Sequence, residues 1–521
     1  MKTHAWRAPS ALLIAALLVG AACGAPTGEV TGASAEDADA GTAADPQDLA
    51  TSPEDDPDGT GPSLDFPEEE LAGLGTGPAI GVSTPGFDGE TIVLGVMSPP
   101  EGSPDEQASA SAAAGAAAYV AELNERGGVA GKHPVELHPV PVSEAGDERS
   151  AYEASRDDVL LYVHVPRGSA PRLREAFLAD DVVGAPAATD ARWLRTQNAL
   201  AFATPDEMQV ANGLDWALQE AGVPVEPLDE PAPGPRPDGA TGATGRSGGS
   251  TSTSGAGDGQ AEKSRSKAEA PEHTVCVVAR TSDQANAAVS AVRVVTRARG
   301  VDLGTVVAPP PPAADGRFPG IGDVITRLKK ASCRTVVLAT APDRTVAVMR
   351  AASRGTYAPQ WVALSWSWTP EIAEGQLARY AGKNLAVVGT GVVPWGTDAD
   401  GDAARRLRRA RDAHAPDIVD GDLDFAFGYA QAMVAHQVIE RAVAMGDLSR
   451  GGIINAINTI DLLQLGGLAD DVAFGRPEQR RAPRASAVLG VDRDAPWGLR
   501  VLAEPQRSAA TVAVSSELDI P

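Results

Sequence analysis

The chain has 521 residues, with 44 Lys and Arg against 70 Asp and Glu, and carries a formal net charge of −26. At roughly 100–200 residues per domain, this length excludes a single small domain. The acidic balance excludes a nucleic-acid binder, which needs a basic face to neutralise phosphates. The 55 Gly and 41 Pro, beside only 4% aromatic residues, indicate that part of the chain cannot bury enough apolar surface to fold.

The N-terminus is typical of an export signal over residues 1–22. Lys2 and Arg7 precede an apolar run over residues 11–19, and small residues follow at 20–22. The run is too short for a membrane span of roughly 20 residues. Cys23 after small residues resembles the lipobox of bacterial lipoproteins, which implies a lipid anchor at Cys23. Gly20 departs from that pattern, so cleavage after Ala22 and free secretion stay an alternative.

Two segments have the composition of unfolded chain. Residues 23–90 are predicted to be a disordered acidic tether, since residues 24–90 hold 16 acidic side chains and no Lys or Arg. Residues 224–271 are rich in Gly, Ser and Pro without apolar periodicity and are predicted to be a flexible linker inside a folded region.

The first folded region alternates short β-branched runs with amphipathic helical patterns. Strands are predicted at residues 91–97, 135–142, 160–165 and 181–185. Helices are predicted at residues 106–124, 147–157, 169–179 and 206–221.

The same alternation resumes after the predicted linker. Strands are predicted at residues 274–279, 304–307, 334–339, 360–364 and 385–393, and helices at 284–299, 320–331 and 342–354. Helices at 401–413, 424–445 and 449–458 follow, before a strand-rich end. This alternation, interrupted near its middle, predicts an α/β protein with two doubly wound Rossmann-like lobes.

The remaining cysteines, Cys276 and Cys333, each start a Val-rich run. An exported chain meets an oxidising compartment, so the two can form a disulfide, or they can be two small core residues. The sequence contains no GxSxG elbow after a predicted strand, no HExxH motif and no metal-ligand spacing. It therefore predicts no enzyme activity, no metal and no cofactor.

Four segments together resemble the type I periplasmic binding proteins of the leucine/isoleucine/valine type, the extracytoplasmic receptors of ABC importers. They are TIVLGVMSPPEG (91–102), AYVAELNERGGVAGKHPVELHPV (118–140), residues 157–190 and residues 331–363. The resemblance implies two lobes joined by three crossings. Lobe 1 would comprise residues 90–204 and 392–468, lobe 2 residues 205–391 and 469–505, and residues 506–521 would form a C-terminal tail.

The resemblance also implies a function. The chain would bind a small polar or amphipathic solute, such as an amino acid, amide or related acid, and pass it to a permease and ATPase. Ser98, Ser169, Ala187 and Thr189 follow first-lobe strands, where hydroxyls and backbone N–H groups suit a carboxylate. Ser169 and Thr189 can equally be helix caps.

The second lobe departs from the family pattern. In amino-acid binders an acid after the strand of this lobe meets the ligand's ammonium, but here the strand is followed by Trp366 and Trp368, with no acid before Glu371. Either Glu371 or Asp343 substitutes, or the ligand is not an α-amino acid. The two tryptophans are candidates for a stacking wall, with interlobe packing as the alternative, and Tyr429 is a further candidate ligand contact.

Three other functions compete with import. The chain could be a surface receptor that reports ligand occupancy to a partner protein, or a scaffold that keeps the fold without the ligand. An exported enzyme is the third alternative, which the missing motifs disfavour.

Overall fold

The computed structural model describes residues 84–144, 146–224, 273–396 and 399–521. The predicted signal, Cys23, residues 23–83 of the predicted tether and residues 225–271 of the predicted linker lie outside the described residues. Within the described part of the chain, no helix combines the length and apolar character needed to cross a membrane.

The first half of the fold is built on a four-stranded parallel sheet with the order β2-β1-β3-β4. Its strands are β1 (Ile92–Ser98), β2 (Val135–Pro141), β3 (Leu161–Val165) and β4 (Gly184–Pro186). The helices between them are α2 (Glu106–Glu125), α3 (Glu148–Ser155) and α4 (Ala170–Ala179). Every residue of β3 is buried, as expected for a parallel strand covered on both faces.

The second half is built on a seven-stranded sheet with the order β13-β12-β9-β8-β7-β5-β6. Its strands are β5 (Thr274–Ala279), β6 (Asp302–Val307), β7 (Thr335–Ala339), β8 (Gln360–Leu364), β9 (Leu385–Val388), β12 (Ser486–Val491) and β13 (Leu499–Gln506). Its helices include α5 (Asp206–Glu220), α6 (Asp283–Arg299), α7 (Ile321–Lys330), α8 (Pro342–Ser353) and α9 (Gly375–Asn384). β5 to β9 pair in parallel, whereas β12 runs antiparallel to both β9 and β13. The predicted α/β class with two wound sheets is confirmed.

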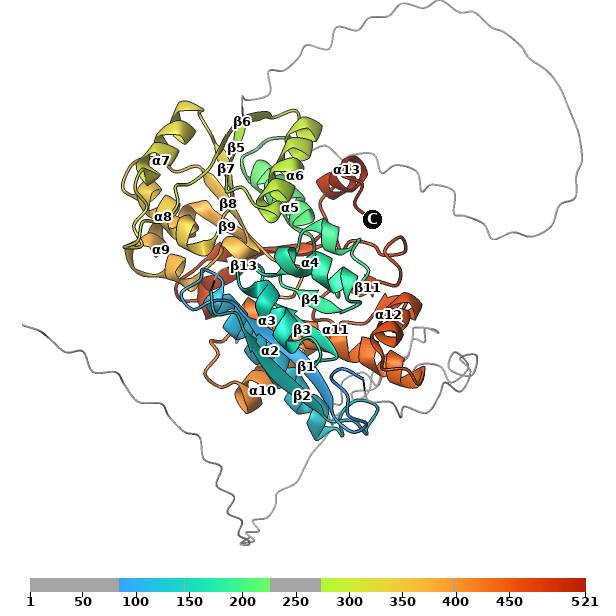
Figure 1. Cartoon of the computed structure of the whole chain (residues 1–521). Coiled ribbons are helices and arrows are strands. Elements are labelled where there is room, and N and C mark those ends of the chain that lie inside the picture. The colour runs from blue at the N-terminus through green and yellow to red at the C-terminus, as the bar shows by residue number, and fades with distance from the viewer. Residues whose placement is uncertain (1–83, 145, 225–272, 397–398) are drawn as a thin grey trace, which may run out of the picture. The chain divides into compact units, whose positions relative to one another are not determined.

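The chain returns to the first half after β9, as Figure 1 shows for the orange helices beside the blue and teal elements. The returning elements are α10 (Asp402–His414), α11 (Leu423–Ala444), α12 (Arg450–Thr459) and the short strands β10 (Leu462–Leu463) and β11 (Val472–Ala473). α11 packs along α2 so closely that a Cβ on Gly428 would lie 1.8 Å from the Ala112 carbonyl oxygen. Only glycine fits this helix crossing.

Three segments that pass between the halves meet at Thr204. The Thr204 backbone N–H donates to the Thr390 carbonyl at 2.8 Å, and its hydroxyl donates to the Ala485 carbonyl at 2.6 Å. The strand predicted over residues 385–393 ends early, at Val388, because the chain leaves the sheet at this crossing. Gly391 there has φ +90°, and a Cβ on Gly391 would lie 2.5 Å from the Thr204 hydroxyl oxygen.

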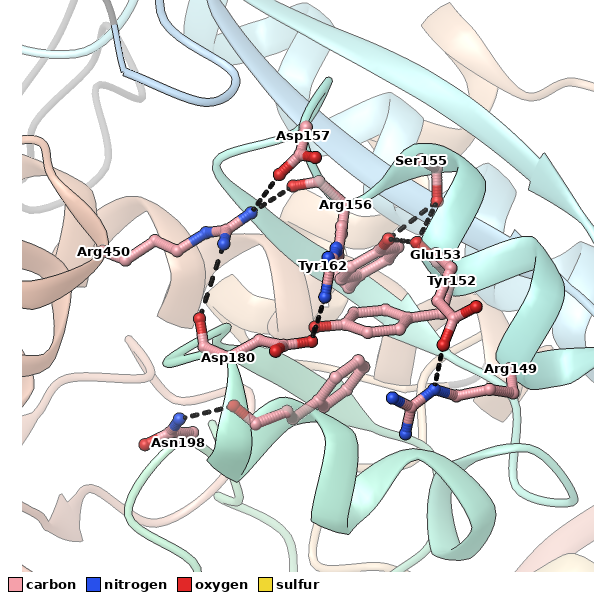
Figure 2. A network of polar contacts seen from close by, with 11 residues as sticks. Arg149, Tyr152, Glu153, Ser155, Arg156, Asp157, Tyr162, Asp180, Asn198 and Arg450 are labelled. Carbon is pink, nitrogen blue, oxygen red and sulfur yellow. Dashed lines mark hydrogen bonds and ion pairs between the residues drawn. The ribbon is translucent and has the colours of Figure 1, made fainter.

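A polar network ties α12 to the early part of the first half (Figure 2). The Arg450 guanidinium donates to the Arg156 carbonyl at 2.6 Å and pairs with the Asp157 carboxylate at 3.2 Å. The Asp180 carboxylate accepts from the Tyr152 hydroxyl at 2.8 Å and from Arg156 at 2.5 Å. The returning segment is thus held to the ends of α3 and α4 by charge-assisted hydrogen bonds.

The end of the chain differs from the predicted tail. Residues after β13 form α13 (Ala510–Glu517), which packs on α5 and α6. Ala510, Val514 and Ile520 are buried in the core of the second half, and the Ala510 N–H donates to the Asp215 carboxylate at 3.1 Å. The helix covers part of α5 and α6, and the short Ala- and Val-containing segment did not indicate this helix in the sequence.

Cys276 and Cys333 form a disulfide in the core beside β5 and β7. The bond closes a loop with a sequence separation of 57 residues. Closing a loop of this length removes conformational entropy from the unfolded chain.

We expect the double variant Cys276→Ala/Cys333→Ala to lose about 3–4 kcal/mol of unfolding free energy, because the unfolded chain regains that entropy. Urea unfolding followed by tryptophan fluorescence measures the loss. Reduced wild-type protein should approach the stability of the double variant. Equal stability of oxidised wild type and double variant would contradict the expectation.

Candidate functional site

A cavity lies between the two halves, at the carboxyl ends of parallel strands. The first half contributes residues that end or follow β3 and β4 and parts of α2 and α11. The second half contributes residues that follow β8 and β9, together with Val387 and Trp497. Ligands of wound α/β sheets bind at this edge, because the loops there are free to vary while the strands hold them in place.

The cavity is narrow in this conformation. Its volume is about 40 Å³. One water needs about 10–15 Å³ of such space, so there is room for about three waters. Much of its wall is apolar, formed by Ala112, Ala187, Val387, Leu423, Phe427 and Trp497.

Two polar N–H groups of the lining residues have no hydrogen-bond partner among the described residues. They are Nε of Arg167, which follows β3, and Nε1 of Trp368, which follows β8. Trp368 is 5% exposed and the Arg167 side chain 14%. A buried donor without a partner costs about 1–3 kcal/mol, so both groups favour a ligand that supplies an acceptor.

Two carboxylates lie at the same cavity. Asp105, just before α2, pairs with Arg167 at 3.8 Å and accepts from the Gly168 backbone N–H at 3.0 Å. Burial and the nearby Asp422 raise the pKa of Asp424, at the start of α11, well above its usual range. Asp424 therefore keeps its proton to a higher pH than an exposed carboxyl group, whereas Asp422 is held in place as the cap of α11.

His164, from β3, also lines the cavity and is 1% exposed. Its Nε2 lies 2.8 Å from the Ser109 hydroxyl oxygen, and its Nδ1 lies 2.8 Å from Oε1 of Gln431. Burial lowers the pKa of His164 to about 4, so the ring is neutral at physiological pH.

Of the ligand contacts predicted from the sequence, Ala187 and Trp368 line the cavity. Ser98 is exposed at the end of β1. Ser169 is 2% exposed at the start of α4, and its side chain makes no capping hydrogen bond. The turn after β3 instead brings Arg167, two residues earlier, to the cavity.

The other predicted contacts lie in the packed interior. The Thr189 hydroxyl donates to the Asp206 carboxylate at 2.7 Å and so belongs to the crossing. Trp366 packs in the core of the second half. The Tyr429 hydroxyl donates to Glu122 at 2.5 Å in the contact between α11 and α2, because Tyr429 lies on the face of α11 that meets α2. The prediction of Tyr429 as a cavity residue is not supported by this geometry.

The acids considered as partners for an ammonium group lie elsewhere. Glu371 pairs with Arg350 at 2.5 Å, with both side chains about half exposed, and Asp343 lies 3.6 Å from Arg344. Asp105 and Asp424 bring carboxylates to the cavity from the first half instead. The sequence reasoning missed Arg167, although Arg167 lies just after the strand predicted over 160–165. It also missed Asp424, which stands at the start of the helix predicted over 424–445, where an acidic residue is common.

A wider hollow of about 790 Å³ lies between residues 393–396, 399–404, 466–467 and parts of 495–505. Its lining is rich in Gly, Ala and Pro, with charged residues such as Asp402 and Arg500. The narrower cavity is the stronger site candidate, because strand ends line it and two of its lining residues have buried donors without a partner among the described residues.

Acidic side chains are buried just after Thr204, where the chain first passes from the first half to the second. Asp206 accepts from Thr189 and from Gln284 at 3.1 Å, and Glu207 accepts from the Ala191 N–H at 3.1 Å. Burial raises the pKa of Asp206 to about 7 and that of Glu207 to about 8. Both carboxyls therefore keep a proton in the folded state at pH values where the unfolded chain has lost it.

We expect Asp206→Asn to gain stability relative to wild type as pH rises. A folded pKa above the unfolded value means that the wild type loses stability between about pH 4 and pH 7, and the amide removes that loss. Between pH 5 and pH 8 the gain should be about 3 kcal/mol. Urea unfolding at pH 5 and pH 8 measures it, with the half-exposed Asp283→Asn as control. A pH-independent difference would contradict the expectation.

The comparisons with known proteins agree with this geometry. A sequence model of the periplasmic binding protein family matches residues 187–496, more than half of the chain. A search of curated protein sequences found no significant match.

Solved structures share the fold at low sequence identity. The fatty acid ABC transporter substrate-binding protein from Thermomonospora curvata has a TM-score of 0.66 and 17% identity, over 84% of this chain and 97% of that chain. A solute-binding protein from R. palustris in complex with 4-hydroxybenzoate has a TM-score of 0.58 and 12% identity, over 81% and 98%. A branched chain amino acid ABC transporter protein from Thermus thermophilus with bound valine has a TM-score of 0.55 and 13% identity, over 82% and 98%. The chain belongs to the periplasmic binding protein family and has the type I fold of the substrate-binding proteins of ABC transporters.

Proposed function

We propose that this chain is the extracytoplasmic solute receptor of an ABC importer and that its ligand is a small amphipathic carboxylic acid. The observation that carries the ligand class is the pair of partnerless donors, Nε of Arg167 and Nε1 of Trp368, beside apolar walls. A carboxylate supplies acceptors to both donors, and the walls suit a hydrocarbon body.

The ligand named for each of the three similar structures is an acid: a fatty acid, 4-hydroxybenzoate and valine. This agreement supports an acid for this chain as well. An ABC permease and ATPase would be the partners, and a lipid at Cys23 would hold the receptor at the outer face of the cell membrane.

Arg167 and Trp368 come from opposite halves, so a ligand that touches both favours the closed arrangement. Such a ligand shifts an open-to-closed equilibrium by its differential contacts with the two states. The small volume of the cavity in this conformation means that the halves must separate to admit an organic acid.

Calorimetry with the exported chain tests the proposal. Octanoate, benzoate, 4-hydroxybenzoate and valine are compared with octanamide and benzamide. At least one acid should bind, and octanoate or benzoate should bind at least about tenfold more tightly than its own amide, since the amide lacks the charge. Trp368→Phe should weaken binding, while Trp366→Phe, a matched change in the core, should not. Indifference to every acid would refute the proposal.

A further inference from the structure

A hydrogen-bond chain runs from the backbone of β4 to the cavity. The Gln431 side-chain amide nitrogen Nε2 lies 3.0 Å from the Ala185 carbonyl oxygen. That carbonyl can only accept, so Nε2 must be the donor, and Oε1 is the atom that faces His164. Gln431 is fully buried, which holds this orientation.

The orientation of Gln431 sets the tautomer of His164. Oε1 of Gln431 can only accept, so Nδ1 of His164 carries a hydrogen. A neutral imidazole has a single N–H. Burial lowers the pKa of His164 and keeps the ring neutral, while the charges of Arg167 and Asp105 act on this pKa in opposite directions. Nε2 is therefore an acceptor.

The state of Ser109 follows from that of His164. Its hydroxyl oxygen lies 2.8 Å from Nε2, so the hydroxyl must donate its single hydrogen to the ring. Ser109, 6% exposed on α2, also lines the cavity. Its oxygen therefore keeps lone pairs but has no hydrogen left to donate to a ligand in the cavity.

We propose that Ser109 is a specificity-determining residue that acts toward the ligand only as a hydrogen-bond acceptor. The preferred ligand therefore carries a hydrogen-bond donor in addition to its carboxylate. This inference rests on the proposed function and narrows it to hydroxy or amino acids. An acceptor facing Ser109 would meet only lone pairs, and an apolar group would leave the buried oxygen unpaired on that side. Asp424 is a second acceptor at the same cavity and favours the same ligands when ionised.

The serine and histidine do not form a hydrolytic pair in this arrangement. In the Ser-His-Asp triad the third group is a carboxylate that stabilises the imidazolium, whereas here it is the neutral Gln431 amide. A histidine whose proton affinity is lowered by burial is a weak base for a serine.

Calorimetry with matched ligand pairs tests the proposal. The pairs are 4-hydroxybenzoate with 4-fluorobenzoate, and leucine with 4-methylpentanoate. For each pair of which at least one member binds the wild type, the ligand with the extra donor should bind at least about tenfold more tightly than the ligand without it. Tenfold is the effect of one charged or buried hydrogen bond. In Ser109→Ala this preference should fall below about threefold.

The control is Ser111→Ala, the same change on the same helix, where the hydroxyl donates to Asp422 at 2.8 Å. It should keep the wild-type preference. Equal affinities within the pairs, or a preference that survives in Ser109→Ala, would overturn the proposal. If no acid binds the wild type, the proposed function fails and this inference fails with it.

Nitrogen NMR of histidine-labelled protein gives an independent readout. His164, assigned by comparison with His164→Gln, should show a protonated Nδ1 and a bare Nε2 between pH 5.5 and pH 8. A protonated Nε2 would overturn the proposal even if the acids bind.

Discussion

Replacement of Arg480 by methionine should lower the free energy of unfolding by about 4 kcal/mol, one of the largest effects expected of a single change in this chain. Arg480 is fully buried and its guanidinium donates to the carbonyl oxygens of Gly475, Leu194, Thr196, Gln197 and Ala199 at 3.0–3.4 Å. Its carbon Cζ lies 4.4 Å from the centroid of the Phe474 ring.

The direction of this effect follows from two opposing costs. Burial lowers the pKa of Arg480 to about 10, which corresponds to roughly 3 kcal/mol of charge desolvation that methionine would relieve. Against this, methionine leaves the buried carbonyls of Gly475, Leu194 and Ala199 without this donor at about 1–3 kcal/mol each, and together these costs exceed the relief.

Urea unfolding measures the loss, and Arg481→Met is the control, because Arg481 is exposed on the same segment. Arg480→Lys should be intermediate, since an ammonium keeps the charge but has three donors. If Arg480→Met unfolds at the wild-type urea concentration, the carbonyl contacts do not stabilise the protein as argued.

Replacement of Arg167 by glutamine should weaken binding of the preferred acid by about 10- to 100-fold, the loss expected for a charged hydrogen bond in a buried site. The side chain lines the cavity, and its Nε is buried with no hydrogen-bond partner in the part of the chain that the structure describes. Its 3.8 Å pair with Asp105 is long, so the change should cost less than about 1 kcal/mol of stability.

Calorimetry with octanoate and octanamide, or benzoate and benzamide, checks this prediction. In Arg167→Gln the preference for the acid over its amide should disappear, because the variant lacks the cation. Arg172→Gln, a matched change on the exposed surface of α4, should keep wild-type affinity. An unchanged preference in Arg167→Gln would show that another group binds the carboxylate.

The sequence was most informative where structure depends on neighbouring residues. The Val-rich runs at 274–279 and 160–165 are buried strands within a residue of their predicted limits, and the helix predicted over 424–445 is α11. Strand and helix periodicity is a local property, so these elements follow from the pattern alone. α13 did not, because its small apolar residues acquire a helical role only when α5 and α6 lie beneath them.

The binding residues were less predictable. Ser169 and Thr189 were chosen as the polar residues after two strands, but whether such a side chain faces a cavity depends on the turn. The turns after β3 and β4 bury Ser169 and direct Thr189 to Asp206, while Arg167 and Ala187 line the cavity.

The sequence by itself determined the α/β class, the order of the elements and the family, because hydrophobic periodicity and short motifs are written in adjacent residues. Only the tertiary structure decided which side chains meet. Ser109, His164 and Gln431 come from three elements, and the contacting residues His164 and Gln431 are 267 residues apart in sequence. These three residues come into contact only when α2 and α11 pack together against the first sheet. The direction of the hydrogen bonds between them is set by that packing.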